Sequence, residues 1–533
     1  MRIPRVLPLA AAAVVLAACS AAPRATPNAQ VAPGYLALAD PAVTAGGTLD
    51  VQMTVDNGAA TGLDPQLAEV ATSWQIMSLV YETLVTVGPD FSIQPQLATS
   101  WDTPDPTTYV FHLRDGVTFS NGRAMTADDV VGSFERLLGS QSIWRAQIGP
   151  VRQVSKVDDR TVEVKLSAPY EPFLASLANV PAAILPMQEI RNGSLDLATT
   201  MLGTGPFVVE SHRQDVSWRF TRREGYWAAG KPSVDTVNIT IAAQEQARMA
   251  ALQNGSADLV TLGNVDSPRL VQGLPGAAVA TQATTDFYYL MLNGNAPGGK
   301  FADPRVRQAI TIAMDRDTIA TTALGGFGKP TGVTPAGLPG ACDPARLPSA
   351  TSNLDQAKQL LQDAGAENLA FQLTIFNTEP APAIAQVIQQ NLARIGITVT
   401  IEQLDEGSWS GKVYGAAPAT FDAAMSWFAG YADAGMAAKW WNPEQAGFNA
   451  GFMKPDPALN AKIDQAIATS GPQRRSALQD LCAAVDTDAQ MIPLVTRPAL
   501  VGYRKDALSP TVYATEGYGN VLRGISDFRL LTK

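Results

Sequence analysis

The stretch LATSWDTPDPTTYVFHLRDGVTFSNGRAMTADDV, residues 97–130, combines a strand pattern with the start of a helix. Apolar and polar side chains alternate over 109–113, as they do in a half-buried strand, and an Asp-Gly pair at 115–116 ends the run. Thr126 stands three residues before Asp129, which resembles the spacing of a capping box, and the apolar residues after it recur at helical spacing. The stretch therefore predicts a strand and a helix in close succession.

The same mixture of strands and helices continues along the chain. A helix pattern stops at Gly396, and an alternating strand pattern over 397–401 follows at once. A helix, a tight glycine and a strand in that order are typical of α/β proteins, so we predict an α/β fold. Further strands are expected at 47–55, 159–167 and 237–241, and further helices at 67–84, 303–313, 353–365 and 478–485.

The composition indicates a large folded protein. The chain has 533 residues, of which 46% are hydrophobic and 17% charged, enough for two to four domains at about 150 residues each. Its formal net charge of −10 argues against nucleic acid as a partner, because binding to phosphates needs cations. Three Cys and two His leave little material for metal sites or histidine-dependent catalysis. We therefore predict a protein that is not an enzyme and has no metal or other cofactor.

The first 19 residues resemble the signal sequence of a bacterial lipoprotein. Arg2 and Arg5 precede a mostly apolar segment, 6–18, whose length suits a signal peptide, whereas a membrane span needs about 20 residues. The segment ends in a Leu-Ala-Ala-Cys run that resembles the lipobox, and this resemblance implies that Cys19 is acylated and becomes the new N-terminus. An ordinary signal peptide with an accidental Cys is the alternative.

We therefore expect a signal peptide at 1–18 and a lipidated Cys19 with a flexible tether over 19–45, which is rich in Ala, Pro and Thr. Loss of the two arginines would lower the net charge from −10 to −12. The lipid would hold the protein on the bilayer, at the outer face of the cytoplasmic membrane.

Other chemical motifs have simpler interpretations. Residues 294–300 fit the spacing of a phosphate-binding loop, but Phe301 stands where a Mg²⁺-binding Ser or Thr is needed. His112 belongs to the strand pattern around it, and His212 is expected on the surface. No catalytic residue is predicted.

Two cysteines remain after Cys19. Cys342 and Cys482 could form a disulfide in an oxidising compartment. Alternatively, Cys482 lies on the apolar face of its predicted helix, where a free thiol acts as a small hydrophobic side chain. The sequence leaves both interpretations open.

Four aromatic residues gather within a short stretch: Trp427, Tyr431, Trp440 and Trp441. Glycines and charged residues are interleaved with them, as in a surface on which a ligand stacks, whereas a core spaces its aromatics by the period of the element. The core interpretation also stays open, because Trp427 directly follows a strand pattern at 421–426.

Several blocks of the chain, taken in order, resemble one family. Besides 97–130 they are GTGPF at 203–207, REGYW at 223–227, DPRVRQAI at 303–310 and Ile-Gly-Ile at 395–397. Together they resemble the large extracellular solute-binding proteins of ABC importers, the group that contains oligopeptide- and dipeptide-binding proteins. Arg223 stands where this family usually has Asn.

The resemblance implies a two-lobed fold like that of periplasmic binding proteins, of the large class with an extra subdomain, with the ligand cleft between the lobes. Lobe I is expected to comprise residues 46–80, 192–282 and 500–533, the extra subdomain of lobe I residues 81–191, and lobe II residues 283–499. The fold does not fix the ligand, which has to be inferred from the site.

At the expected site the sequence departs from the family. Peptide-binding members carry a Trp-x-x-Asp element whose carboxylate meets the ligand's α-amine, but here Gly430 follows Trp427 at that spacing, and the nearest acid is Asp433. A buried ammonium without a counter-charge is costly. The Arg that dipeptide-binding members keep for the ligand's carboxylate also has no equivalent within 373–384. The residues expected to contact the ligand are Trp427, Ala429, Gly430, Tyr431, Asp433, Trp440, Trp441 and, from lobe I, Asn57.

The resemblance implies a monomeric, lipid-anchored protein that captures a solute outside the membrane and delivers it to an ABC permease. An oligopeptide without a clamped free amine is the preferred ligand, with a saccharide, a tetrapyrrole or a metal chelate as the alternative. The net charge mildly favours neutral or cationic solutes. A secreted hydrolase would need two convergent carboxylates or a nucleophile with its base, and the sequence offers neither. A structural lipoprotein with a degenerate cleft also stays open.

Overall fold

The computed structural model of the chain describes residues 45–57, 62–68, 71–88, 90–140, 142–282, 284–296, 299–415, 417–428, 430–446, 449–509, 522 and 524–531. The predicted signal peptide, Cys19 and the tether up to residue 44 lie outside the described residues, and so does Ala429. No helix of the described part is long and apolar enough to cross a membrane.

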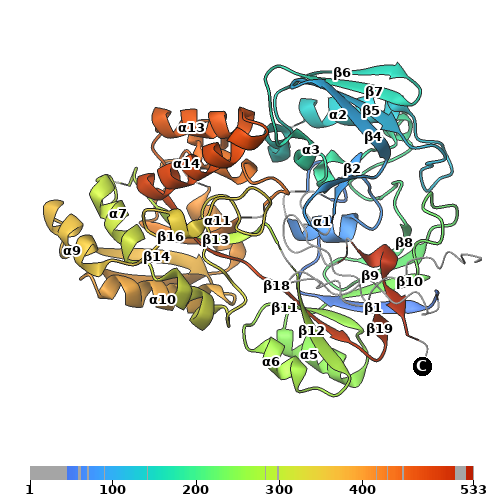
Figure 1. Cartoon of the computed structure of the whole chain (residues 1–533). Helices are drawn as coiled ribbons and strands as arrows, with labels where there is room; N and C mark the ends of the chain where they lie inside the picture. Colours follow the sequence, from blue (N-terminus) through green and yellow to red (C-terminus); the bar gives the residue numbers. More distant parts are fainter. Residues whose placement is uncertain are drawn as a thin grey trace, which may run out of the picture.

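Lobe I is built on a mixed seven-stranded sheet in the order β12-β18-β11-β1-β10-β9-β8 (Figure 1). β1 lies at its centre and pairs in parallel with β10 and β11. Alternate residues of β1 face the core, as the side-chain period of a strand requires. The strands are β1 (Thr48–Met53), β8 (Phe207–Arg213), β9 (Ser217–Arg222), β10 (Thr236–Ile241), β11 (Leu259–Leu262), β12 (Ala277–Gln282) and β18 (Ala499–Arg504). The helices are α1 (Ala71–Met77), α5 (Glu245–Asn254) and α6 (Ser267–Gln272).

The helix observed within the predicted range 67–84 is shorter than the apolar pattern that predicted it. Helix α1 ends at Met77, because the carbonyls of Leu79 and Val80 accept hydrogen bonds from the segment 205–207 instead of from the next helical turn. The apolar residues beyond the helix are still buried. Tertiary pairing therefore overrides the helical period here.

The extra subdomain carries an antiparallel sheet in the order β4-β5-β7-β6, with α2 packed on it. The predicted cap of α2 is present, since the Asp129 carboxylate accepts hydrogen bonds from the Thr126 amide at 3.0 Å and from its hydroxyl at 3.2 Å. The elements are β2 (Val85–Val87), β3 (Ile93–Pro95), β4 (Ala98–Asp105), β5 (Thr108–Leu113), α2 (Ala127–Gly139), β6 (Val151–Asp158), β7 (Thr161–Leu166), α3 (Phe173–Ser176) and α4 (Met187–Arg191).

Lobe II has a five-stranded sheet in the order β15-β14-β16-β13-β17. Helix α10 buries the apolar face predicted for it, and Gly396, with φ of +88°, leads from there into β15. The strands are β13 (Phe287–Leu292), β14 (Ala370–Phe376), β15 (Thr398–Leu404), β16 (Ala423–Phe428) and β17 (Met491–Thr496). The helices are α7 (Pro304–Ala313), α8 (Arg316–Thr318), α9 (Leu354–Asp363), α10 (Ala381–Ala393), α11 (Glu406–Val413), α12 (Pro443–Ala446), α13 (Pro457–Ala468) and α14 (Pro472–Asp488).

The chain passes between the two large sheets twice, from β12 to β13 and from β17 to β18. Figure 1 shows the two sheets as separate bodies joined by these crossings. The first sheet takes no strand from 283–498 among the described residues, and the second takes strands only from that part. The predicted α/β fold with two lobes is confirmed. A short pair, β19 (Leu508–Ser509) and β20 (Arg529–Leu530), follows β18.

The structure contains a disulfide between the two cysteines, which is the first of the two interpretations that the sequence left open. Cys342 and Cys482 are bonded in lobe II across 140 residues of sequence. Both residues are buried, and Cys482 lies on the buried face of α14. The bond ties a long loop to this helix.

Candidate functional site

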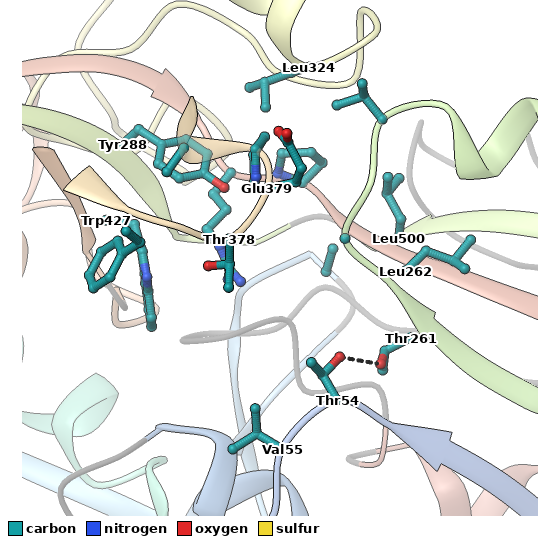
Figure 2. Close-up of a pocket in the computed structure, with 18 of the residues that line it drawn as sticks. Thr54, Val55, Thr261, Leu262, Tyr288, Leu324, Thr378, Glu379, Trp427 and Leu500 are labelled. Atoms are coloured by element: carbon teal, nitrogen blue, oxygen red, sulfur yellow. Dashed lines mark hydrogen bonds between the residues drawn. The ribbon is translucent and has the colours of Figure 1, made fainter. Parts of the chain in front are cut away.

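A cavity of about 250 Å³ lies between the two sheets, beside the crossing strands. Figure 2 shows Tyr288, Thr378, Glu379 and Trp427 on the lobe II side, and Thr54, Val55, Thr261 and Leu262 on the lobe I side. Residues 497–501, which follow β17 and include the start of β18, also line the cavity. Both lobes and their connection therefore contribute to the cavity.

The strand topology explains why these residues meet. β1 and β11 run in parallel, so the chain leaves both strands at the same edge of the sheet, where Thr54 and Thr261 face each other with their hydroxyl oxygens 3.4 Å apart. In lobe II, β14 ends at Phe376 and the chain turns over the cavity into α10. The carboxyl ends of parallel strands are the usual place for a ligand in open α/β sheets.

An ion pair joins the two crossing strands. The Arg497 guanidinium lies 3.1 Å from the Asp286 carboxylate, and the Arg497 amide donates to the Asp286 carbonyl at 2.9 Å. The Thr284 hydroxyl donates to the Arg497 carbonyl at 2.7 Å. The Asp286 side chain is fully buried, whereas that of Arg497 is 21% exposed and lines the cavity. The pair therefore holds a cation at the cavity wall.

Trp427 is attached to this ion pair. It lies on β16, and the Arg497 guanidinium carbon is 4.5 Å from the centroid of its ring, within the range of a cation–π contact. Of the four aromatic residues predicted to stack on a ligand, Trp427 is the one that lines the cavity.

Gly430 lies directly against the first crossing strand. A Cβ atom at this position would stand 2.4 Å from the Thr285 carbonyl oxygen and 2.5 Å from its hydroxyl oxygen. The Gly430 amide donates to the second carboxylate oxygen of Asp286 at 3.3 Å. The hinge backbone therefore occupies the space that an amine-clamping side chain at this position would need.

The acid that could have replaced the clamp is already paired. The Asp433 carboxylate lies 2.8 Å from the Arg474 guanidinium and accepts the Gly435 amide at 2.8 Å. It is buried and does not belong to the cavity wall.

The other predicted rings lie in packed interiors. Tyr431 is buried in the core of lobe I, and burial raises the pKa of its hydroxyl above the usual value. Trp441 donates to the Met491 carbonyl at 2.9 Å, and Trp440 packs edge-on against Phe428 with ring centroids 5.1 Å apart. These three residues do not line the cavity.

The segment that carries these rings joins lobe II to the extra subdomain. The Lys439 amine donates to the Ala146 carbonyl at 2.7 Å and lies 4.9 Å from the centroid of the Tyr170 ring. Burial lowers the pKa of Lys439 to about 8. The amide of Glu171 donates to the Ile467 carbonyl at 3.0 Å nearby. The segment that carries the aromatic cluster therefore also packs lobe II against the extra subdomain.

Asn57 is also buried outside the cavity wall. Its side-chain amide donates to the Gly62 carbonyl at 3.2 Å, and its side-chain oxygen has no partner in the described part of the chain. The neighbouring Asp56 carboxylate accepts the Trp218 indole at 2.6 Å and contacts His212 at 3.2 Å. His212, expected on the surface, is thus partly buried in a structural network.

The described wall of the cavity combines the aromatic rings of Tyr288, Phe376 and Trp427 with hydroxyl groups and the Arg497 guanidinium, and it includes the exposed Glu379. Such a wall can bind a small solute by stacking and hydrogen bonds. The described residues contain no group of three His, Cys, Asp or Glu that could hold a metal ion. Sequence patterns did not reveal Asp286 and Arg497, because neither belongs to a periodic run or a spaced motif.

Comparisons with known proteins agree with this architecture. Residues 92–449 match the family of bacterial extracellular solute-binding proteins, family 5 Middle. The glutathione-binding protein GsiB of Salmonella typhi is 26% identical over 487 residues, which cover 86% of this chain and 91% of that protein. The dipeptide-binding protein of Escherichia coli K12 is 29% identical over 397 residues, covering 66% and 71%.

A solved structure shows the same fold. The ABC transporter-associated periplasmic binding protein DppA of Helicobacter pylori, in complex with peptide STSA, superposes with a TM-score of 0.77 at 24% identity and covers 92% of this chain and 99% of that chain. This likeness shows the fold, and the family match, which covers more than half of the chain, shows the family: the chain belongs to the bacterial extracellular solute-binding proteins of family 5, which serve ABC importers.

Proposed function

We propose that this protein captures a short peptide in the cavity between its lobes and delivers it, unchanged, to an ABC permease. The observation that carries the proposal is the cavity at the double crossing, with walls from both lobes and a ring, Trp427, that faces it. A ligand held there contacts both lobes at once, so its binding favours the closed arrangement, as in other hinged binding proteins.

Three observations support a short peptide. The cavity volume of about 250 Å³ lies just below the range of about 300–1,000 Å³ typical of small-molecule sites. The chain leaves β1 and β11 at the cavity, where its backbone groups can pair with the amides of an extended ligand. Two relatives are named for small peptides, a dipeptide-binding protein and a glutathione-binding protein.

Native mass spectrometry of the protein purified from its own host tests the ligand class. We expect a set of co-purified masses that fragment as peptides of a few residues. A single sugar, tetrapyrrole or metal-chelate mass would refute the peptide assignment and would favour the second candidate, a non-peptide solute at the same site.

A second measurement tests whether the protein performs chemistry. The released peptides are added back to the emptied protein, and the mixture is analysed after prolonged incubation. We expect full recovery of intact ligand together with a rise in melting temperature. Cleavage at a rate proportional to protein concentration would show a hydrolase instead, and a melting temperature unaffected by any ligand would indicate a degenerate cleft.

We also propose that acylated Cys19 anchors the protein at the outer face of the cytoplasmic membrane. In cells fed a labelled fatty acid, the wild-type protein should take up label and fractionate with membranes. Cys19→Ser should do neither, because a hydroxyl is a poor nucleophile for the acyl transfer. A Cys342→Ser/Cys482→Ser variant is the matched control and should keep the label. Label in the Cys19→Ser protein would contradict the anchor.

A further inference from the structure

We infer that Phe327 and Val265 form a reciprocal apolar clasp, in which each lobe places one side chain in the core of the other, and that this clasp stabilises the closed form. Phe327 is a positioning residue that raises the affinity for every ligand by a common factor. The inference rests on the proposed function, since it concerns the closure of the lobes around a ligand, and it adds the residues that hold the lobes closed.

Phe327 belongs to a short loop of lobe II, residues 324–328, but packs on lobe I. Its side chain is half-buried against an apolar cluster made of lobe I residues. The buried members of this cluster are Ala251, Leu252, Ala257, Val260, Leu262, Val271, Ala277 and Leu500. They come from α5, α6 and strands β11, β12 and β18, or lie next to these elements. Phe327 therefore extends the core of lobe I although it belongs to the chain of lobe II.

Val265 makes the opposite exchange. It follows β11 in lobe I, and its half-buried side chain packs against the apolar core of lobe II, which includes residues of β13, α7 and α10. The backbones also meet here, because a Cβ atom at Gly325 would stand 3.4 Å from the Val265 carbonyl oxygen. The two lobes are therefore interlocked at this point.

The loop that carries Phe327 is anchored in lobe II at both ends. On one side the Gly326 amide donates to the carbonyl of Ala320, in the helical segment Ile319–Ala323, at 2.9 Å. On the other side the Lys329 amide donates to the Thr496 hydroxyl on β17 at 3.0 Å, and the Thr496 amide donates to the Lys329 carbonyl at 2.8 Å. The loop therefore moves with lobe II, and its contact with lobe I must break when the lobes separate.

The clasp lies beside the cavity. Val265 and Leu324 line the cavity together with Leu262 and Leu500, two members of the lobe I cluster; the three leucines are labelled in Figure 2. Phe327 itself is not a residue of the cavity wall. Its substitution therefore changes the contact between the lobes and leaves the described surface that meets a ligand in place.

The clasp stabilises closure through the hydrophobic effect. Separation of the lobes would expose both apolar side chains to water, which is unfavourable. When a ligand binds tightly only to the closed form, its apparent affinity is reduced in proportion to the fraction of molecules that are closed. Loss of the clasp therefore weakens the binding of different ligands by one and the same factor, whereas loss of a ligand contact affects each ligand differently.

Titration calorimetry with dialanine, trialanine and tetra-alanine, combined with small-angle X-ray scattering, tests the inference. In Phe327→Ala we expect the affinity for each peptide that binds the wild-type protein to fall at least about fivefold, by the same factor for all of them. Scattering is measured without peptide and at several concentrations of each peptide. At equal peptide concentration the variant should have a larger radius of gyration than the wild-type protein.

Two further variants serve as controls. Phe327→Leu keeps an apolar side chain at the clasp and should retain the affinity within about twofold. Met249→Ala is the matched control, because Met249 is also half-buried against the lobe I cluster but belongs to α5 of lobe I itself. It should lower the melting temperature and leave affinity and scattering unchanged.

The outcomes separate this inference from the proposed function. If folded Phe327→Ala binds the peptides and scatters like the wild-type protein, the inference is overturned and the peptide function stands. The inference is also overturned if the loss of affinity differs between the peptides or occurs equally in Met249→Ala. If none of the peptides binds the wild-type protein, the peptide function fails, and scattering without peptide decides: a more open Phe327→Ala protein supports the clasp, and identical curves overturn it.

Discussion

Replacing Gly430 by alanine tests how closely the site and the hinge are packed. The added methyl group would lie 2.4 Å from the Thr285 carbonyl oxygen, 2.5 Å from its hydroxyl oxygen and 2.7 Å from its Cβ atom. Only the hydroxyl oxygen can move by rotation of the Thr285 side chain, whereas the carbonyl oxygen and the Cβ atom are fixed to the backbone of the crossing strand. The strand therefore has to move away from β16.

The expected cost is that of inserting a methyl group into a packed interior, about 1–3 kcal/mol. For a unit the size of lobe II, each kcal/mol lowers the melting temperature by about 2–4 °C, so a cost of about 2 kcal/mol corresponds to a decrease of about 4–8 °C. Displacement of the crossing strand should also weaken the contact between the Gly430 amide and Asp286 and alter the distribution of open and closed forms.

Calorimetric melting and small-angle X-ray scattering of the ligand-free protein measure these two effects. Gly411→Ala is the control, because Gly411 is an exposed residue of α11 with open space around its Cβ position, and alanine there should be neutral or slightly stabilising. The reasoning is refuted if Gly430→Ala melts within 1 °C of the wild-type protein and scatters identically.

Three other predictions follow from the contacts at the site. Trp427→Ala should weaken ligand binding by about 1–3 kcal/mol in calorimetry, whereas Tyr431→Ala should lower the melting temperature with affinity retained; the reverse pattern would exchange their roles. Reduction of the disulfide between Cys342 and Cys482 should destabilise lobe II by up to about 5 kcal/mol, because the intact bond closes a loop of 140 residues. An unchanged urea midpoint after complete reduction would contradict this prediction. The pKa of Lys439 is lowered to about 8 in the folded protein, so between pH 8 and 10 the unfolded chain binds more protons than the folded protein and the free energy of unfolding rises with pH. Urea titrations should therefore show the stability of the wild-type protein rising relative to that of Lys439→Met over this pH range. A constant difference between the two proteins would refute the pKa shift.

Local sequence patterns predicted the elements that are stabilised by their own residues. The alternation at 109–113 corresponds to β5, and the Asp-Pro pair at 303–304 opens α7, where Asp303 accepts the Arg305 amide. Gly396 stands between a helix and β15 as expected. In each case the deciding interactions span only a few residues, so the sequence contains them directly.

The site could be predicted only in part, because its deciding contacts are distant in sequence. Asp286 and Arg497 are separated by 211 residues and meet because the chain crosses twice between the lobes. Trp427 was identified from an aromatic cluster, but the same cluster also contains Tyr431, Trp440 and Trp441, which are packing residues. An irregular aromatic stretch at a lobe boundary therefore indicates the neighbourhood of the cavity without distinguishing ligand contacts from contacts between lobes.

The glycine at position 430 connects the end of β16 with the crossing strands beside the cavity. Without a side chain there, the end of β16 approaches the crossing strand closely enough for its amide to reach Asp286. Asp286 in turn holds Arg497 against the ring of Trp427. The close backbone contact at Gly430 and the ion pair between Asp286 and Arg497 therefore share one carboxylate, that of Asp286. Because a Cβ atom at position 430 would stand 2.4 Å from the Thr285 carbonyl oxygen, an acid introduced there would have to displace the crossing strand, so the backbone itself restricts which side chains this position can carry.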